Sequence, residues 1–134
     1  MARIITTQLC TVFLVAIFVL AISVQGDQSQ LCEPSSIQIG QTNTGKKART
    51  LDTVFQVTVT NGCRCAVRAV LLRADGFASS VAVDPRLFRR ASAAAGAYLV
   101  GDGQQIASGK SVSFQYTWDH YFKMTLASVK VVAC

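Results

Sequence analysis

Two cysteines separated by one residue, at 63–65, are the feature that most constrains how this chain can fold. They follow a run at 54–60 in which apolar and polar side chains alternate, a pattern that predicts a β-strand with one buried face. Asn61-Gly62 tolerates positive φ and predicts a turn between the strand and the cysteines. Cys32 and Cys134 lie towards the two ends of the chain. Bridges from both would staple the beginning and the end of the domain to one central corner.

The first 26 residues predict a signal peptide that is removed. Arg3 is the only charge before an apolar run at 9–24, and Gly26 is a small residue of the kind found at a cleavage site. The alternative is a membrane anchor, because the run is near the lower length for a span. Removal takes Cys10 away and leaves a secreted chain of 108 residues, 27–134, with four cysteines. An even number of cysteines fits an oxidising, extracellular compartment.

Residues 27–134 predict a single domain, since they contain no second apolar span, long linker or repeat. Without Arg3 the chain has 12 basic and 7 acidic residues, a net charge of +5 with His120 neutral. This balance favours an acidic partner, although ordinary solubilising charge explains it equally well. Secretion argues against nucleic acid as a partner, and no membrane contact is expected once the signal peptide is removed.

Short apolar and alternating runs separated by turn residues predict an all-β domain. Seven strands are expected, at 37–39, 54–60, 66–73, 77–83, 98–100, 111–116 and 124–133. In the third of these, Val67, Ala69 and Leu71 are placed on one face. Parallel strands would need helical crossovers that the chain lacks. The fold is therefore predicted to be a single antiparallel β-sandwich of about seven short strands, stapled by disulfides and preceded by the signal peptide.

The segments between these strands are expected to be loops. A polar loop at 40–50 carries Lys46, Lys47 and Arg49, which suit a solvated hairpin tip, with a binding patch or a cleavage site as the alternative. Pro85 is placed at the start of a single helical turn. Too short to hold a helix in water, the alanine tract at 92–97 is read as a loop or one loose turn.

Catalytic and metal-binding constellations are not found in the sequence. His120 is the only histidine, no G-x-S-x-G turn occurs, and the carboxylates stand mostly in turn contexts such as Asp75-Gly76 and Asp84-Pro85. Cys63, Cys65 and a remote His120 do not supply the paired knuckles of a zinc site. We therefore predict no enzyme activity, no metal and no cofactor.

Disulfides are the remaining use for the four cysteines of 27–134, and four cysteines allow three pairings. A bridge between Cys63 and Cys65 is the least favourable because it closes a very tight ring. Two pairings remain open. We favour Cys32 with Cys63 and Cys65 with Cys134.

Two stretches are candidates for binding. Arginine beside a large apolar side chain is enriched at protein interfaces. The first candidate is formed by Arg86, Leu87, Phe88, Arg89 and Arg90. In the alternative, Leu87 and Phe88 belong to the core and only the three arginines face a partner.

The second candidate is an aromatic loop at 118–122, where Tyr116, Trp118, Tyr121 and Phe122 could form a flat platform for sugar rings. In the alternative, Tyr116 lies in the core and the others plug one end of the sandwich.

Several motifs together resemble the tapetum determinant family of small secreted plant proteins. They run in the order C-x-P-S-S-I, V-T-V-T-N-G-C-R-C, D-G-F, D-P-R-L-F-R-R, L-V-G-D-G, S-V-S-F-Q-Y and V-V-A-C, and cover 32–134. The resemblance implies a ligand, secreted to the apoplast, for the ectodomain of a leucine-rich-repeat receptor kinase in anther cell-fate specification, with the stretch from Arg86 to Arg90 as the candidate contact. The alternative function is a cell-wall carbohydrate-binding module whose partner is a polysaccharide.

The family pattern usually has six cysteines, and the two that are missing here fall at Ala74 and Tyr98. Two absences are most simply one lost bridge, because losing a single partner would leave a free thiol. This comparison implies that the other four cysteines form two bridges.

Overall fold

The computed structural model describes residues 32–92 and 94–134. The predicted signal peptide at 1–26 lies outside the described residues. Within the described part, no helix combines the length and the apolar character needed to cross a membrane.

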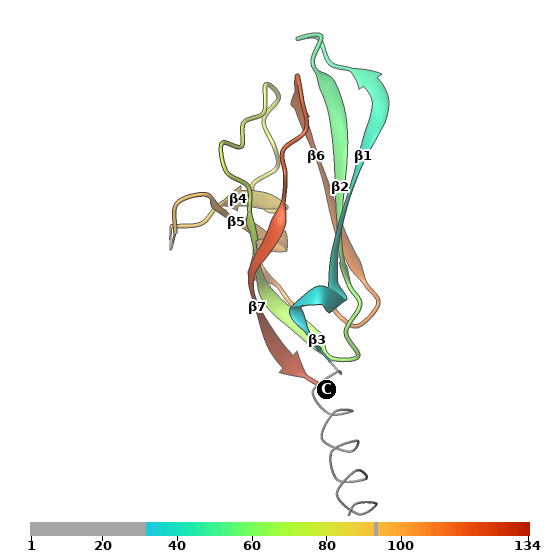
Figure 1. The fold of residues 1–134 in the computed structure, drawn as a ribbon, viewed down its shortest axis with the longest axis vertical. Coiled ribbons are helices and arrows are strands. Elements are labelled where there is room, and N and C mark those ends of the chain that lie inside the picture. Colours follow the sequence, from blue (N-terminus) through green and yellow to red (C-terminus); the bar gives the residue numbers. More distant parts are fainter. Residues whose placement is uncertain (1–31, 93) are drawn as a thin grey trace, which may run out of the picture. The chain divides into compact units, whose positions relative to one another are not determined.

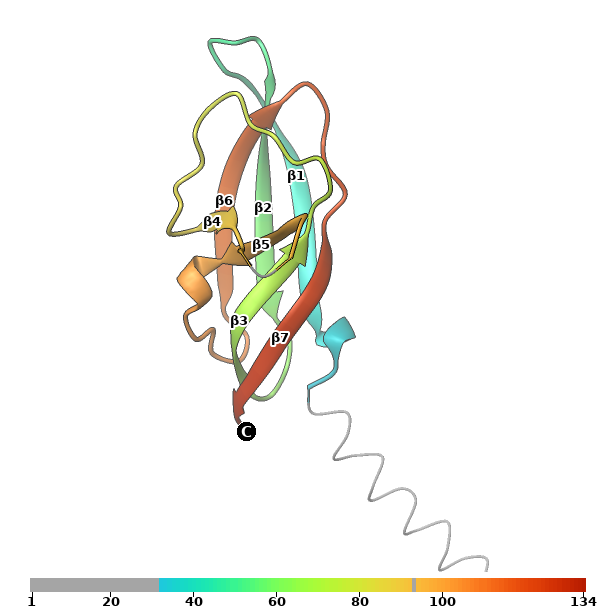
Figure 2. The same ribbon diagram turned by 90° about the vertical axis from the view of Figure 1, so that its left-hand side faces the viewer.

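Seven strands form two antiparallel sheets packed as a sandwich (Figures 1 and 2). The first sheet has the order β1 (Ile37–Lys47), β2 (Thr53–Asn61), β6 (Ser111–Trp118). The second has the order β4 (Phe88–Arg90), β5 (Ala97–Val100), β3 (Ala66–Arg73), β7 (Thr125–Ala133). Two short 3₁₀ turns, η1 (Pro34–Ser36) and η2 (Gly101–Gly103), complete the elements of the described residues. The predicted all-β antiparallel sandwich of about seven strands is confirmed.

Alternation in β2 and β6 builds the centre of the core, as predicted. Val57 and Val59 are fully buried, and the partner of Val57 across the sheet is Phe114, which is also buried. Phe55 pairs with Tyr116 in the same register, and their rings stack with centroids 5.2 Å apart. One face of this sheet therefore supplies a continuous apolar layer, while serine, threonine and glutamine occupy the other.

A β-bulge in β3 changes which side chains are buried. Ala69 has φ +51°, and the register with β7 shifts between Arg68 and Leu71. Beyond the bulge Val70 and Leu72 are buried, whereas Ala69 and Leu71 are only half-buried. The prediction that Val67, Ala69 and Leu71 share the core face is therefore wrong after Val67, because one extra residue inverts the alternation.

Two other segments differ from the prediction. The polar stretch 40–47 continues β1 and pairs with β2, so the loop expected at 40–50 is confined to the hairpin tip. The strand expected at 77–83 is absent from the described structure, where this stretch is irregular. Its apolar pattern serves instead to place the ring of Phe77 against Phe88 and Tyr116, at centroid distances of 5.1 and 5.3 Å.

Both disulfides lie at one end of the domain, close to the C-terminus and opposite the hairpin tip between β1 and β2 (Figure 1). Cys32 pairs with Cys63 and Cys65 with Cys134, at Cα–Cα distances of 4.7 and 4.1 Å. This is the favoured pairing, and it is confirmed. Cys63 and Cys65 are buried, so the two bridges meet in the core at the corner between β2 and β3.

Asn61 and Gly62 do not adopt the positive φ that the dipeptide predicts. Asn61 ends β2 with its side chain 1% exposed, and its Oδ1 accepts a hydrogen bond from the Cys63 N–H at 2.9 Å. Its Nδ2 donates to the carbonyls of Cys65 and Ile106, both at 2.9 Å. At Gly62 an added Cβ would lie 2.6 Å from the Ser36 carbonyl oxygen, which explains the glycine by close approach and not by a turn.

The two positions where the family usually has cysteine lie near each other. Tyr98 in β5 is the cross-strand partner of Leu72, and Ala74 follows two residues later on the same face. Both Ala74 and Tyr98 are buried. Aromatic contacts occupy the site, since Tyr98 stacks on Phe88 with centroids 4.8 Å apart. This placement is consistent with one lost bridge.

Candidate functional site

The arginine turn, defined here as 84–90, begins where the sequence predicts a single turn. The N–H groups of Leu87 and Phe88 both donate to the Asp84 carbonyl, at 2.9 and 3.1 Å. Pro85 stands where the missing N–H is not required. The Asp84 carboxylate also accepts from the Arg86 N–H at 2.9 Å, which fixes the turn from its own side chains.

Phe88 is the first residue of β4 and belongs to the core. It is 3% exposed and stacks between Tyr98 and Phe114, with centroids 4.8 and 4.3 Å away. Leu87 is half-buried and packs against the core. The structure therefore matches the alternative in which the two apolar side chains face inward, and Phe88 is corrected from a surface anchor to a core residue.

The arginines of the turn are exposed and two of them are paired. Arg86, whose side chain is 83% exposed, donates to the Asp84 carboxylate from Nε at 3.2 Å and from Nη2 at 2.9 Å. Arg89 forms an ion pair with Asp102 and donates to the Pro85 carbonyl at 3.3 Å. The sequence reasoning missed that these two carboxylates would face the arginines.

Arg90 has no ion pair within the described part of the chain. It is exposed on the three-residue strand β4.

The hydrogen bonds between Asp84 and Arg86 shift the pKa values of both residues. The side-chain hydrogen bond from Arg86 is the main cause that lowers the pKa of Asp84. The same bond raises the pKa of Arg86. Both groups are therefore charged across the ordinary pH range, and the turn presents a locally balanced ion pair on an exposed surface.

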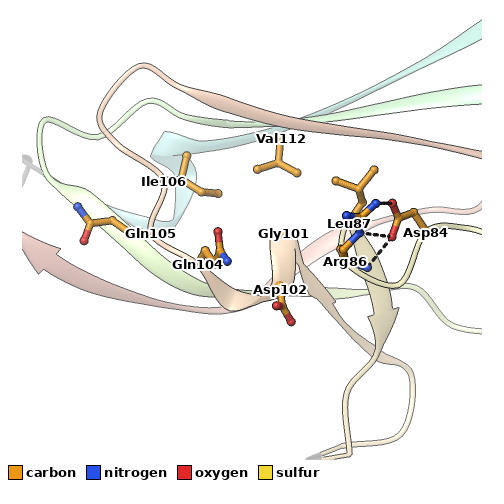
Figure 3. Close-up of a pocket in the computed structure, with 9 residues that line it drawn as sticks. All are labelled: Asp84, Arg86, Leu87, Gly101, Asp102, Gln104, Gln105, Ile106 and Val112. Carbon is orange, nitrogen blue, oxygen red and sulfur yellow. Dashed lines mark hydrogen bonds and ion pairs between the residues drawn. The ribbon is translucent and has the colours of Figure 1, made fainter.

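A hollow of about 390 Å³ lies beside the arginine turn (Figure 3). Figure 3 shows Val112 of β6 between Ile106 and Leu87, with the Asp84–Arg86 pair at one end of the hollow and Gln105 at the other. Asp102 on η2 lies on the opposite side from Val112. The hollow thus has apolar walls and a charged end. In sequence, the dipeptide Asp102-Gly103 indicates only a turn and gives no sign of a hollow.

The aromatic loop does not form the flat platform considered from the sequence. Phe122 is buried, and Trp118 is half-buried against it with centroids 6.4 Å apart. Tyr116 is also buried, and its hydroxyl donates to Gln41 Oε1 at 2.7 Å and accepts from the Phe122 N–H at 3.0 Å. Burial raises the pKa of Tyr116. These rings plug one end of the sandwich, as the alternative predicted.

Tyr121 is the exception, because it is 65% exposed. It borders a second hollow of about 510 Å³. The other side chains around this hollow are Ile39, Gln41, Asn43, Phe55, Lys123 and Met124. A single exposed ring beside polar groups is what remains of the predicted carbohydrate platform.

The basic residues of the predicted polar loop stand at and beside the hairpin tip. Lys46, Lys47 and Arg49 are exposed there, and Lys47 Nζ donates to Thr53 Oγ1 at 2.8 Å. Leu51 is also exposed, with φ +67°. The tip is therefore both basic and apolar.

Across residues 32–92 and 94–134, no group of three or more His, Cys, Asp or Glu side chains could hold a metal ion. The distinctive side chains are instead spread over an outer surface, around the arginine turn and its hollow. Fold and surface together define a small β-sandwich domain held by two disulfides.

Comparison with known proteins assigns the family. The model of the family "Tapetum determinant 1, C-terminal" matches residues 33–132, and the chain belongs to this family. The confirmed resemblance covers nearly all of the described domain.

Similar curated proteins come from rice and Arabidopsis. TPD1 protein homolog 1A of Oryza sativa subsp. japonica is 34% identical over 88 residues, covering 60% of this chain and 37% of that protein. TPD1 protein homolog 1 of Arabidopsis thaliana is 34% identical over 80 residues, covering 56% and 42%. An uncharacterized Arabidopsis thaliana protein is 35% identical over 71 residues, covering 52% and 55%. The matched region is thus between about a third and just over half of each relative. No solved structure matches the chain.

Proposed function

We propose that this protein is a secreted signalling ligand that binds the ectodomain of a leucine-rich-repeat receptor kinase in the apoplast, and that it acts in anther cell-fate specification. The match of residues 33–132 to the tapetum determinant family carries the proposal. Two disulfides in a small domain support secretion, because such bridges persist in oxidising compartments. The net charge of +5 on residues 27–134 supports an acidic receptor surface.

The arginine turn is proposed as the receptor contact, through its charged groups and not through Phe88. Arg86 and Arg89 are exposed, and each holds a carboxylate beside it. A partner that offers its own carboxylates can share these guanidinium groups, since arginine has five donors in a fixed fork. Exposed charges of this kind contribute mainly to encounter rate and specificity.

The test is titration calorimetry of residues 27–134 against candidate receptor ectodomains, with Arg86→Glu combined with Arg89→Glu. We expect affinity to fall at least about tenfold, because four carboxylates would then crowd the turn and repel an acidic surface. The matched control is Arg68→Glu with Arg73→Glu on β3. It makes the same change in net charge, and Arg73 also has a carboxylate partner two residues away, Asp75, at 3.2 Å.

Equal losses in the two double variants would show that only net charge matters and would remove the arginine turn from the interface. An absence of binding to every ectodomain tested would count against the receptor-ligand function itself. Circular dichroism and non-reducing mass analysis establish that each variant keeps its fold and its bridges.

Cell-wall polysaccharide is a second candidate partner, favoured by exposed Tyr121 beside its hollow. The test is retention on insoluble cellulose and xylan. Retention that disappears in Tyr121→Ala supports stacking of a sugar ring. If Tyr121→Ala is retained like the unchanged protein, the interaction is charge-driven adhesion and this candidate fails.

A further inference from the structure

One edge of the first sheet is open. In the part of the chain that the structure describes, β6 is hydrogen-bonded to β2 on one side and has no strand on the other. Only its last part is covered, where the Thr117 carbonyl accepts from the Ser80 N–H at 2.8 Å and the Thr117 N–H donates to Ser79 Oγ at 2.9 Å. Both main-chain groups of Thr117 therefore point away from β2.

Alternate residues of an antiparallel strand direct their N–H and C=O to the same side. Ser111, Ser113 and Gln115 share the phase of Thr117, so their main-chain groups also point to the open edge. Within residues 32–92 and 94–134, these groups make no hydrogen bond. Ser111 to Gln115 spans about 13 Å at the rise of a β-strand, which is room for a five-residue partner.

A groove runs along this open edge. The hollow beside the arginine turn (Figure 3) and a third hollow of about 380 Å³ both border Asp84 and Leu87, so the two are adjacent and we treat them together as the groove. Apolar side chains line its inner wall, and these are Val83, Leu87, Val112 and Phe114. Polar side chains of the sheet's outer face form the other wall, and these are Gln56, Ser113 and Gln115.

We infer that the open edge of β6 binds an extended peptide segment of a partner protein, which adds to the sheet as a further strand. Main-chain groups at Ser111, Ser113 and Gln115 supply the hydrogen bonds, as in other cases of strand addition. The two walls specify the sequence of the segment, because successive side chains of a strand face opposite sides. Apolar residues face Leu87 and Val112, and polar residues alternate with them.

Charge specifies that the polar residues are acidic. The charged residues that line the groove are Asp84, Arg86 and Asp102, and each carboxylate is paired with an arginine, Asp84 with Arg86 and Asp102 with Arg89. Lys110, which precedes Ser111 in the chain, adds one positive charge to these balanced pairs. Residues 27–134 carry a net charge of +5, so a second copy pairing edge to edge would bring two basic molecules together. An acidic segment of a different protein is favoured by the same field that opposes self-pairing. The inference goes beyond the proposed receptor function, since it does not require the partner to be a receptor.

The test uses residues 27–134 and a synthetic nonapeptide in which valine alternates with glutamate, with binding followed by fluorescence anisotropy. Ser113→Pro removes one outward N–H from β6, and proline is tolerated on an edge strand at a position whose N–H is unused. We expect Ser113→Pro to weaken binding at least about tenfold. The matched control is Ser113→Ala, which keeps the N–H and is expected to bind within about twofold.

Two further readouts do not depend on whether Ser113→Pro folds. Amide exchange at Ser111, Ser113 and Gln115 is expected to slow when the peptide binds to the unchanged protein. Two methylated peptides are compared, one with methyl groups on the backbone nitrogens of the glutamates and the other on those of the valines, and only one of the two is expected to lose binding. The peptide methylated on its glutamates loses binding if the added strand is antiparallel, and the peptide methylated on its valines loses binding if the strand is parallel, because only one edge of the peptide meets β6.

Four outcomes would overturn the inference. The first is that Ser113→Pro binds the nonapeptide as tightly as the unchanged protein, and the second is that both methylated peptides lose binding or neither does. The third is that the nonapeptide does not bind. The fourth is that protection of 111–115 from amide exchange rises with protein concentration without peptide. The last of these, with a dimer in sedimentation, would assign the edge to a second copy of the chain.

Discussion

Replacement of Asn61 by alanine is expected to destabilise the domain more than any other change of a single polar residue in the described structure. Asn61 is buried and joins three stretches of chain, through the Cys63 N–H and the carbonyls of Cys65 and Ile106. The Ile106 carbonyl has a second partner, since it also accepts from the Val67 N–H at 3.0 Å. The N–H of Cys63 and the carbonyl of Cys65 have none within residues 32–92 and 94–134.

The expected cost follows from those two groups. A buried donor or acceptor left without a partner costs about 1 to 3 kcal/mol, so the two groups together are expected to lower the free energy of unfolding of Asn61→Ala by about 2 to 6 kcal/mol. For a domain of this size, the melting temperature would fall by at least about 8 °C. Asn61→Ala is also expected to impair folding, because Asn61 positions the backbone of both central cysteines.

The assay is urea unfolding followed by tryptophan fluorescence, with Asn43→Ala as the control. Asn43 Oδ1 accepts from the N–H two residues on, at Gly45, with the same 2.9 Å geometry but in an exposed position. Its loss is expected to cost no more than about 0.5 kcal/mol. Comparable losses at Asn61 and Asn43 would refute the reasoning, since burial is the feature that separates them. Non-reducing peptide mapping shows whether Asn61→Ala also changes the pairing of the cysteines.

Three further predictions concern the glycine, the bridges and the paired carboxylate. Gly62→Ala is expected to lower the melting temperature clearly, because its Cβ would meet the Ser36 carbonyl at 2.6 Å, while Gly40→Ala, with nothing within 4 Å, is expected to leave it nearly unchanged. Removing the Cys65–Cys134 bridge by alanine substitution is expected to lower the free energy of unfolding by about 4.4 kcal/mol, and removing Cys32–Cys63 by about 3.7 kcal/mol, because the bridges close separations of 69 and 31 residues. Denaturant unfolding measures both values, and the reverse order would contradict the chain-entropy account. The pKa of the Asp84 carboxyl, measured by NMR, is expected to lie below its ordinary value and to rise in Arg86→Gln. Because the folded state has the lower pKa, the contribution of Asp84 to stability is present above a pH of about 3.9 and is lost as pH falls through the folded pKa.

The sequence predicts strands well where one face is buried and the other is wet. At 54–60 and 111–116 every second side chain enters the core, so alternation and structure coincide. The outer part of β1 lacks this signal because Thr42 and Asn43 are exposed on an edge strand whose hydrogen bonds come from the backbone. At Ala69 a bulge breaks the alternation without changing the composition of the strand. Neither feature is encoded in a local apolar pattern.

The candidate sites show the same limit. The arginines around Phe88 leave open in sequence whether it is a surface anchor or a core residue, and the alternation of a three-residue strand turns it inward while Arg89 and Arg90 remain outside. Asp102 reaches Arg89 across 13 residues, so this ion pair depends on how β5 and η2 fold back on β4. The groove along β6 requires the same long-range packing. The cysteine pairing is easier to predict from sequence, because a ring between Cys63 and Cys65 is sterically costly and excluding it leaves only two pairings.

The convergence of both bridges on 63–65 also determines how the domain responds to mechanical load. If Cys32 and Cys134 are pulled apart, tension passes through one disulfide, along Cys63-Arg64-Cys65, and out through the other. Those few covalent links limit the separation of the two ends to about 20 Å, whereas the unlinked chain from 32 to 134 could extend to about 340 Å. Both sheets lie outside this path. In the oxidised form, stretching between its ends therefore cannot unravel the sandwich, and reduction would convert the same domain into an extensible one.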